Sequence, residues 1–323
     1  MSETLSFHFE GALADAHRMN FYEAARFQYA AARLLVKLAQ FRTLGRFSQR
    51  ITEKINYDIQ LASQVDGSFN INVEDPGQTA TDESFIQISL SDLVAFVSER
   101  LIEKIDDAAL DGATSNADGG SQASSASSRA IDRIVQEVLA GKPLTAGLPE
   151  QVKELVRRRV AELHREGRLA ESKKAISRID FARSQKLVAM SAPLISEMAT
   201  ALRESAETLE VRSSSHSGER SVLFLDRRMA AAIETAVVDE EITPIIGDVT
   251  QFNKDNGWGK LKIDGGLKTI NFSIPFDLLP NMRQVIIESM KKDQVFLQTY
   301  FVRDRGNQVI RLIAVGILPM QPD

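Results

Sequence analysis

The chain has 323 residues, of which 43% are hydrophobic and 26% are charged, and it contains no cysteine. This is the composition of a globular protein with two or three domains. The lack of cysteine excludes disulfides, thiolate metal sites and cysteine nucleophiles, and it favours a reducing, cytoplasmic location. The net charge of −5 argues against a uniformly basic nucleic-acid binder but leaves room for local basic patches. Neither a signal peptide nor an apolar run of about 18 residues is visible, so we expect no membrane association.

Residues 1–110 predict an α+β domain in the order strand, helix, hairpin, helix. Alternation of Leu5, Phe7 and Phe9 with polar residues indicates a strand with one buried face. Asn20 is the predicted N-cap of a helix over about 20–43, with Glu23 as its capping-box partner.

The predicted hairpin lies around Asp66-Gly67, because both turn residues tolerate a positive φ and both flanking runs alternate. Another strand-like run spans 85–88. Ser89 with Asp92 then forms a capping pair that begins a helix over 90–106.

The helix over 20–43 carries a stripe of bases and aromatics opposite its apolar face: Tyr22, Arg26, Tyr29, Arg33 and Lys37. A nucleic-acid-binding face has this composition. Amphipathic side chains on an ordinary solvated face give the same pattern, and we favour that interpretation.

Residues 111–128 contain no apolar residue larger than alanine. Such a segment buries too little surface to offset the entropy of ordering, so it is predicted to be a flexible linker between domains.

Residues 129–212 predict a helical region, with one helix ending near Pro143, a second starting at Pro149, a third over about 171–190 and a fourth restarting at Pro193. Within it, residues 151–190 hold eleven bases and five acids, a net charge of +6. This segment predicts a phosphate-contacting surface, with Arg157, Arg158, Lys173 and Lys174 as candidates, or else a solvated helical face with i,i+4 pairs. A helical hairpin also favours self-association, so we expect a homo-oligomer.

Residues 221–323 follow a polar break at 213–218 and begin with a short strand (221–225) and a short helix (227–237). Strands are then predicted over 246–252, 258–263 and 269–274, a helix over 280–290, and strands over 295–302 and 309–315. Three strands, a helix and two strands is the order of an OB-like barrel with five strands.

The first two strands of this module resemble the cold-shock domain family. That family carries V-x-W-F-N-x-x-x-G-[FY]-G-F-I, and the chain matches it with the same spacing at Val249, Phe252, Asn253, Gly257 and Gly259. Trp258 is a different aromatic residue at the [FY] position, and Leu261 is a conservative replacement at the last position. The resemblance covers about 70 residues. It implies single-stranded nucleic acid or RNA as the partner, with Trp258 and Phe272 stacking on bases and Lys254, Lys260 and Lys262 contacting phosphates.

Three departures weaken this implication, because Gln251, Lys260 and Asn271 stand where the family has aromatic residues. The alternative is a small OB or SH3-like barrel that contacts protein. An exposed Trp258 would favour base stacking, and a buried Trp258 would favour this alternative.

Residues 9–17, followed by a long helix, are similar to an element of uncharacterised bacterial proteins, some of them encoded near phage-defence genes. The resemblance implies no residue roles.

No catalytic motif is visible: phosphate-loop, His-Glu-x-x-His and Gly-x-Ser-x-Gly patterns are absent from the sequence. Asp15 and His17, near Glu10, could form a metal or acid/base cluster, but a third ligand would have to come from elsewhere in the chain, and none has recognisable metal spacing. His164 and His216 are expected to be exposed. We therefore expect no catalytic residue, metal or cofactor.

The sequence as a whole predicts a nucleic-acid-binding protein that uses the OB-like barrel and the basic helical region. The alternative is a protein-interaction or scaffold subunit of a bacterial assembly, for which antiphage defence is one setting.

Overall fold

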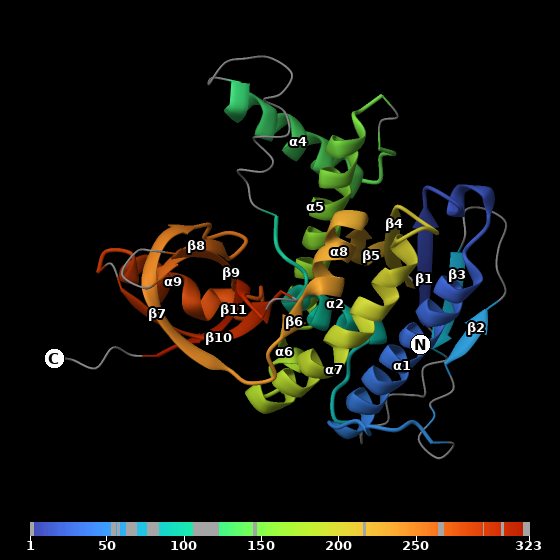
Figure 1. Cartoon of the computed structure of the whole chain (residues 1–323), viewed down its shortest axis with the longest axis horizontal. Helices are drawn as coiled ribbons and strands as arrows, with labels where there is room; N and C mark the ends of the chain where they lie inside the picture. The colour runs from blue at the N-terminus through green and yellow to red at the C-terminus, as the bar shows by residue number, and fades with distance from the viewer. Residues whose placement is uncertain are drawn as a thin grey trace.

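The computed structural model of the chain describes residues 3–52, 56, 59–62, 70–75, 84–105, 123–144, 147–215, 218–263, 268–292, 294–304 and 307–318, with the backbone alone for 123–130, 215, 218 and 235. It has a body of helices around a sheet, and beside it a closed barrel built from the last quarter of the chain (Figure 1). The predicted α+β class is confirmed. In the part of the chain described, no helix is both long and apolar enough to cross a membrane.

The body is organised around β1 (Glu3–Glu10), the central strand of a five-stranded antiparallel sheet. On one side lie β3 (Asn70–Asp75) and then β2 (Gln60–Ala62), the two strands of the predicted hairpin, whose turn is outside the described residues. On the other side lie β4 (Thr208–Ser215) and β5 (Gly218–Asp226). Leu5, Phe7 and Phe9 are buried, as their alternation predicted.

Helix α1 (Phe21–Leu44) covers this apolar face of β1. The ring of Phe27 meets the rings of Phe7 and Phe9 edge-on, at centroid distances of 5.3 and 4.9 Å. Asn20 is the N-cap, as predicted. Glu23 bonds to Ser205 instead of completing a capping box, since it accepts from the Ser205 backbone nitrogen at 3.0 Å.

Helix α2 (Leu90–Leu101) begins with the predicted capping box of Ser89 and Asp92 and ends five residues before the expected position 106. The carboxylate of Glu3 also accepts hydrogen bonds from the Leu90 and Ser91 backbone nitrogens, at 3.0 and 3.3 Å. The run at 85–88 is not a strand. The backbone nitrogens of residues 85 and 86 instead bond to carbonyls at the end of α1.

The helical region contains α4 (Ala123–Leu139), α5 (Glu150–Glu171), α6 (Lys173–Ile176) and α7 (Phe181–Ala199). Short 3-10 turns occur at Ala14–Ala16 and Thr200–Leu202. Residues 123–128 of the predicted linker belong to α4, and residues 111–122 lie outside the described part. Two predictions here are wrong: α7 continues through Pro193, and the segment expected to end a helix near 209 is instead the start of β4.

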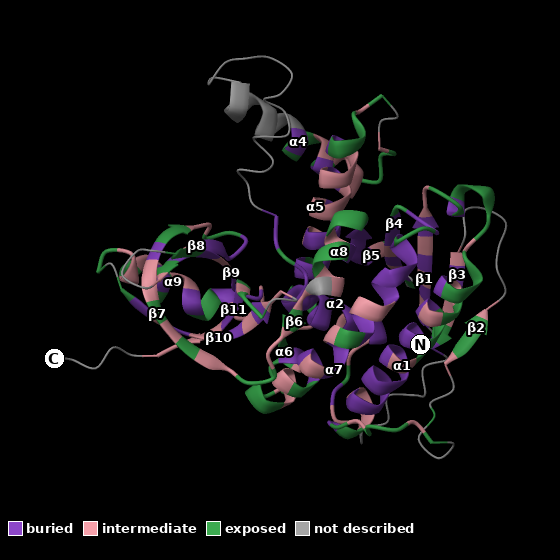
Figure 2. Cartoon of the chain, viewed as in Figure 1, coloured by how far each residue is buried: buried purple, intermediate pink, exposed green. Residues whose placement is uncertain are grey.

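The body is not contiguous in sequence. One apolar core joins β1, α1, α2, α7, β4 and β5 (Figure 2), so residues 208–226 complete a sheet that begins at residue 3. A smaller core, with Val135 and Val156 among its members, holds α4 against α5. The predicted domain boundaries themselves stay a prediction.

After α8 (Arg227–Thr235) and β6 (Val237–Val238), the chain forms the barrel from β7 (Thr243–Phe252), β8 (Trp258–Ile263), β9 (Lys268–Ser273), α9 (Leu279–Ser289), β10 (Val295–Arg303) and β11 (Val309–Ile317). Neighbouring strands pair antiparallel except β9 and β11, which are parallel, and β10 closes the barrel on β7. Five strands and one helix in this order are compatible with the predicted OB-like fold.

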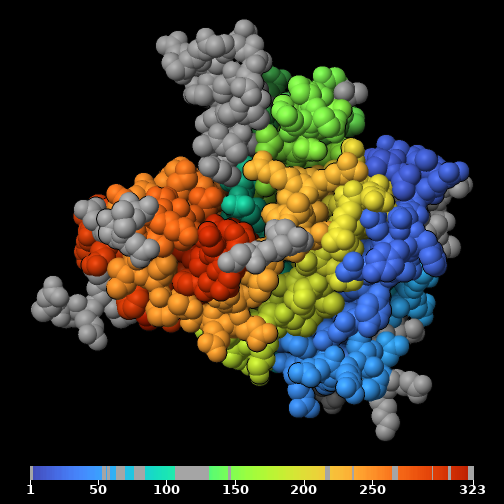
Figure 3. All heavy atoms as spheres, viewed as in Figure 1, coloured from blue at the N-terminus to red at the C-terminus, as the bar shows by residue number. Residues whose placement is uncertain are grey.

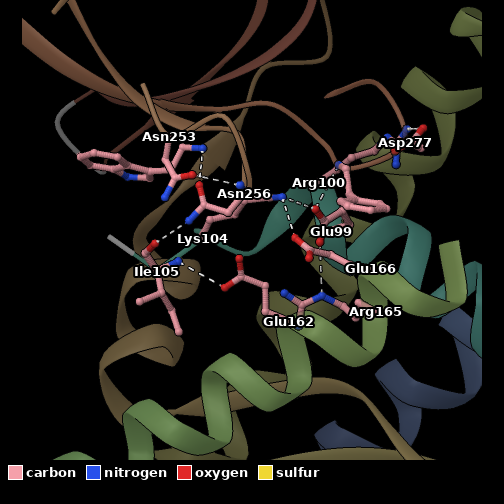
Figure 4. A network of polar contacts seen from close by, with 12 residues as sticks. Glu99, Arg100, Lys104, Ile105, Glu162, Arg165, Glu166, Asn253, Asn256 and Asp277 are labelled. Atoms are coloured by element: carbon pink, nitrogen blue, oxygen red, sulfur yellow. Dashed lines mark hydrogen bonds and ion pairs between the residues drawn. The ribbon is translucent and has the colours of Figure 1, made fainter. Parts of the chain in front are cut away.

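The barrel packs directly against the body (Figure 3). Their junction contains buried ionic side chains (Figure 4). Lys104 Nζ lies 2.7 Å from Glu99 Oε1 and 3.4 Å from Glu166 Oε1, and the Phe276 backbone nitrogen donates to Glu99 at 3.1 Å. Arg100 pairs with Asp277 of the barrel at 2.6 Å.

Burial opposes ionisation of Glu99, but the Lys104 and Arg165 charges lower its pKa overall. Burial raises the pKa of Glu166 to about 7. The junction therefore depends on charges that compensate one another away from water.

Candidate nucleic-acid interface

The two aromatic residues predicted to stack on bases are buried. Phe272 points into the barrel core and lies parallel to Phe252, with ring centroids 6.2 Å apart. Trp258 is 2% exposed. The position of Phe272 gives no support to base stacking, and the burial of Trp258 favours the alternative in which the barrel contacts protein.

Trp258 nevertheless lies outside the barrel's interior. Leu261 belongs to the barrel core, and side chains alternate along a strand, so Trp258 and Lys260 share the outer face of β8. The ammonium of Lys260 lies 5.3 Å from the centre of the indole. The Trp258 backbone nitrogen donates to Asn256 Oδ1 at 2.8 Å, and Asn256 Nδ2 donates to the Ile105 carbonyl at 3.3 Å. Trp258 thus lies where the barrel joins the body.

The remaining barrel candidates are lysines with different exposure. Lys254 and Lys262 are exposed and Lys260 is half-buried. They lie on the β7–β8 hairpin, where the ring that Lys260 contacts, that of Trp258, is buried.

The basic segment 151–190 does not form one continuous surface. Arg157 pairs with Glu10 at 2.7 Å, and Arg165 is buried beside Glu99 in the junction. Arg168 is also buried and pairs with Asp92 at 3.0 Å. Lys173 and Lys174 are exposed on α6, whereas Arg158 lies half-buried near the barrel. Most of the excess charge in α5 therefore has an internal partner.

A large cavity lies elsewhere, between α1 and α7, which lie side by side in Figure 1. Its volume is about 980 Å³. We call it the α1–α7 groove. Its charged and aromatic lining residues are Tyr29, Arg33, Lys37, Phe41, Arg46, Phe47, Asp180, Arg183, Lys186, Glu197 and Glu240.

Cations outnumber carboxylates in this lining, and two of the carboxylates are already paired. Asp180 forms an ion pair with Arg183, and Glu197 pairs with Arg26 at 2.5 Å. Within the described part of the chain, Arg33, Lys37, Arg46 and Lys186 have no ion-pair partner. Among the described residues the groove thus presents four cations without an ion-pair partner against one unpaired carboxylate, Glu240.

Lys37 is the unusual member of this set. It is only 6% exposed, and its Nζ lies 5.6 Å from the centre of the Phe47 ring. Burial, and to a lesser extent the nearby Arg33 charge, lowers the pKa of Lys37. Lys37 has no carboxylate partner among the described residues, so an anion entering the groove would compensate its charge.

Exposed aromatic rings accompany the cations on α1. Tyr29 is 63% exposed, and the Arg33 guanidinium lies 5.4 Å from its ring centre. About two helical turns earlier, Arg26 lies 5.5 Å from the ring centre of exposed Tyr22. Alternating rings and cations of this kind suit bases and phosphates respectively.

The sequence predicted this stripe of rings and cations, but it did not predict the groove. Periodicity placed Tyr29, Arg33 and Lys37 on the polar side of α1, and the solvated-face interpretation was favoured. No local signal showed that Arg183 and Lys186 would lie opposite them, since that depends on how α7 packs.

The predicted absence of a catalytic cluster stays a prediction. Asp15 accepts a hydrogen bond from the Gly11 backbone nitrogen at 2.7 Å, and His17 is exposed. Glu10 instead bonds to His8 Nε2 at 3.0 Å; this bond lowers the pKa of Glu10 to about 2 and raises that of His8. Half-buried His164 accepts from the Ser221 backbone nitrogen, so its expected exposure is wrong, and His216 is outside the described part. The described residues contain no group of three or more potential metal ligands of the His, Asp or Glu type.

The fold and the groove define a class: an α+β protein with an OB-like barrel and a cationic groove in its body. Comparison with models of known families, with curated proteins and with solved structures gives no match. The likeness to cold-shock domains therefore remains a resemblance of residues in the β7–β8 hairpin.

Proposed function

We propose that the protein binds single-stranded nucleic acid through the α1–α7 groove. The observation that carries this proposal is a set of cations that form no ion pair with any described residue, Arg33, Lys37, Arg46 and Lys186, lining one cavity beside the exposed ring of Tyr29. Cations neutralise backbone phosphates, and an exposed ring offers a stacking surface to an unpaired base.

A single strand fits this surface better than a duplex. Aromatic stacking requires a base that is free of its own pairing partner, and the groove is a cavity rather than a flat basic face. This proposal keeps the partner that the sequence predicted and moves its binding site from the barrel to the body.

The test is fluorescence anisotropy with short labelled single-stranded RNA and DNA, and a duplex of the same length, at two salt concentrations. The groove variant is Arg33→Glu with Lys186→Glu. Its matched control is Lys173→Glu with Lys174→Glu, which makes the same change in charge on exposed α6.

The groove variant is expected to weaken single-strand binding by about tenfold or more at low salt, and to reduce the slope of log K against log salt by about 1 to 2. The control should stay close to wild type. Equal losses in both variants would show that only overall charge matters. No binding by the wild-type chain at low salt would reject the proposal and favour the protein-interaction alternative.

A further inference from the structure

A second cavity lies between the body and the barrel. Its volume is about 370 Å³, within the range of small-molecule sites, and we call it the junction pocket. The body contributes apolar residues of α7 and α8, including Ile195, Met229 and Ile233, and the barrel contributes Val302 and Ile310. Most of the residues that line the pocket are thus apolar.

The polar side chains in these walls are mostly arginines. Arg158, Arg228 and Arg311 line the pocket, against one carboxylate, Glu103. Glu103 accepts a hydrogen bond from Asn271, also in the lining, at 3.5 Å. Among the described residues none of the three arginines forms an ion pair.

Arg311 is buried and forms no ion pair with any described residue. It is 8% exposed, and its Nη2 donates to the Leu101 carbonyl at 2.8 Å. Its Nη1 and the Nε of Arg158 are both buried and have no hydrogen-bond partner in the described structure. A buried guanidinium with unused donors is costly unless an anion or acceptor reaches it.

These features restrict the ligand. A cation would face three arginines, and a neutral apolar molecule would leave the Arg311 donors unused. An anion with several charges would meet Glu103. A single carboxylate on an aliphatic body satisfies both the arginines and the apolar walls.

We propose that the junction pocket binds an aliphatic monocarboxylate, with the carboxylate at Arg311 and Arg158 and the chain between α8 and the barrel. The ligand would contact both parts of the molecule at once. The site is independent of the α1–α7 groove.

Isothermal titration calorimetry on the full chain tests this with three probes of equal chain length: decanoate, decan-1-ol and decyltrimethylammonium, each below its micelle-forming concentration. Decanoate is expected to bind with one site per chain, about tenfold or more tighter than the alcohol, and the cation is expected not to bind. The proposal is overturned if decanoate does not bind, or if the alcohol binds equally well.

Two variants on one helix locate the site. Ala232→Phe places a ring in the lining of the pocket, whereas Ala231→Phe adds the same ring at an exposed position of α8 outside it. The first should weaken decanoate binding about tenfold or more, and the second should leave it unchanged. Unchanged binding by Ala232→Phe would refute the assignment.

Arg311→Met tests the role of the charge. Folded protein carrying this change should bind decanoate and decanol with similar affinity, and a retained preference for the carboxylate would contradict the proposed contact. If this variant does not fold, the two α8 variants and the probe series still decide the matter.

Discussion

Lys37 is a single residue whose position lowers the stability of the folded protein. The sequence assigns it to the polar side of α1, but the structure buries it beside Phe47 in the wall of the groove. No carboxylate among the described residues compensates its charge. The unpaired ammonium therefore destabilises the free protein, and it contributes favourably to the binding of an anion.

We therefore expect Lys37→Met to change stability and binding in opposite directions. Methionine keeps most of the length and apolar contact of the lysine stem while removing the charge. The free energy of unfolding in urea should rise by about 1 kcal/mol, and single-strand affinity should fall by about fivefold or more.

The control for this substitution is Lys173→Met on exposed α6, which should alter neither quantity appreciably. A loss of stability in Lys37→Met would show that the lysine already has a compensating partner in the free protein.

Glu3 acts on a single helix from a distant strand. Its carboxylate accepts from the first backbone nitrogens of α2 and from the Ser213 hydroxyl at 2.9 Å, so it ties the start of α2 to β1 and β4. A carboxylate at a helix N-terminus also interacts favourably with the helix dipole.

Glu3→Ala is expected to lower the free energy of unfolding by about 2 kcal/mol, because it leaves buried donors of α2 without an acceptor. Glu74→Ala, at an exposed position on neighbouring β3, is the control and should have little effect. If Glu3→Ala and Glu74→Ala changed the free energy of unfolding in urea equally, the hydrogen bonds to Glu3 would make no specific contribution to stability.

At the scale of elements, local signals predicted most of the fold. The Ser89 and Asp92 pair marks the start of α2, and the turns of the barrel separate its strands at nearly the observed positions. These features depend on a few neighbouring residues, so they are visible in the sequence.

The wrong predictions of secondary structure concern segments whose conformation depends on packing against residues distant in the sequence. The serine-rich stretch in β4 looks like a polar break, but its backbone pairs with β1, where Ser213 lies opposite Leu5. Pro193 looks like a helix start, yet α7 passes through it. The groove and the junction pocket depend on such packing between distant segments, which no local pattern encodes.

Glu166 of α5 lies in the junction, and its contribution to the stability of the fold depends on pH. Its pKa of about 7 in the folded chain lies above the ordinary value of 4.5, so the folded chain holds this proton more tightly than the unfolded chain. Its contribution to stability is therefore greatest below about pH 4.5 and declines as the pH rises to about 7.

The glutamine of Glu166→Gln cannot ionise, so this variant should not lose the corresponding stability as the pH rises. Relative to wild type, the unfolding free energy of the variant should increase by about 2 kcal/mol between pH 4.5 and pH 7. Urea titrations across this range provide the measurement, and a difference that does not vary with pH would contradict the assignment.

For the whole molecule, the single tryptophan reports on how barrel and body meet. Trp258 is buried on the outer face of β8, next to Asn256, which bonds to the Ile105 carbonyl of the body. Its fluorescence should therefore respond to loosening of the junction before the barrel itself unfolds.

Asn256→Ala is expected to increase acrylamide quenching of Trp258 by about twofold, since it removes the hydrogen bond across the junction and a contact to the Trp258 backbone. Asn281→Ala, at an exposed position on α9, should leave quenching unchanged. Unaltered quenching in Asn256→Ala would mean that the indole is shielded independently of this contact.

The order of strands in the body also bears on how the chain is made. β1 emerges from the ribosome before its neighbour β4, which follows about 200 residues later. At about 5–20 residues per second, this leaves one side of β1 without a partner for on the order of ten seconds or more. An open strand edge with Leu5, Phe7 and Phe9 on one face is a template for pairing with other chains. Nascent chains of this protein should therefore depend on chaperones until β4 and β5 have been synthesised, and fragments that end before residue 208 should aggregate.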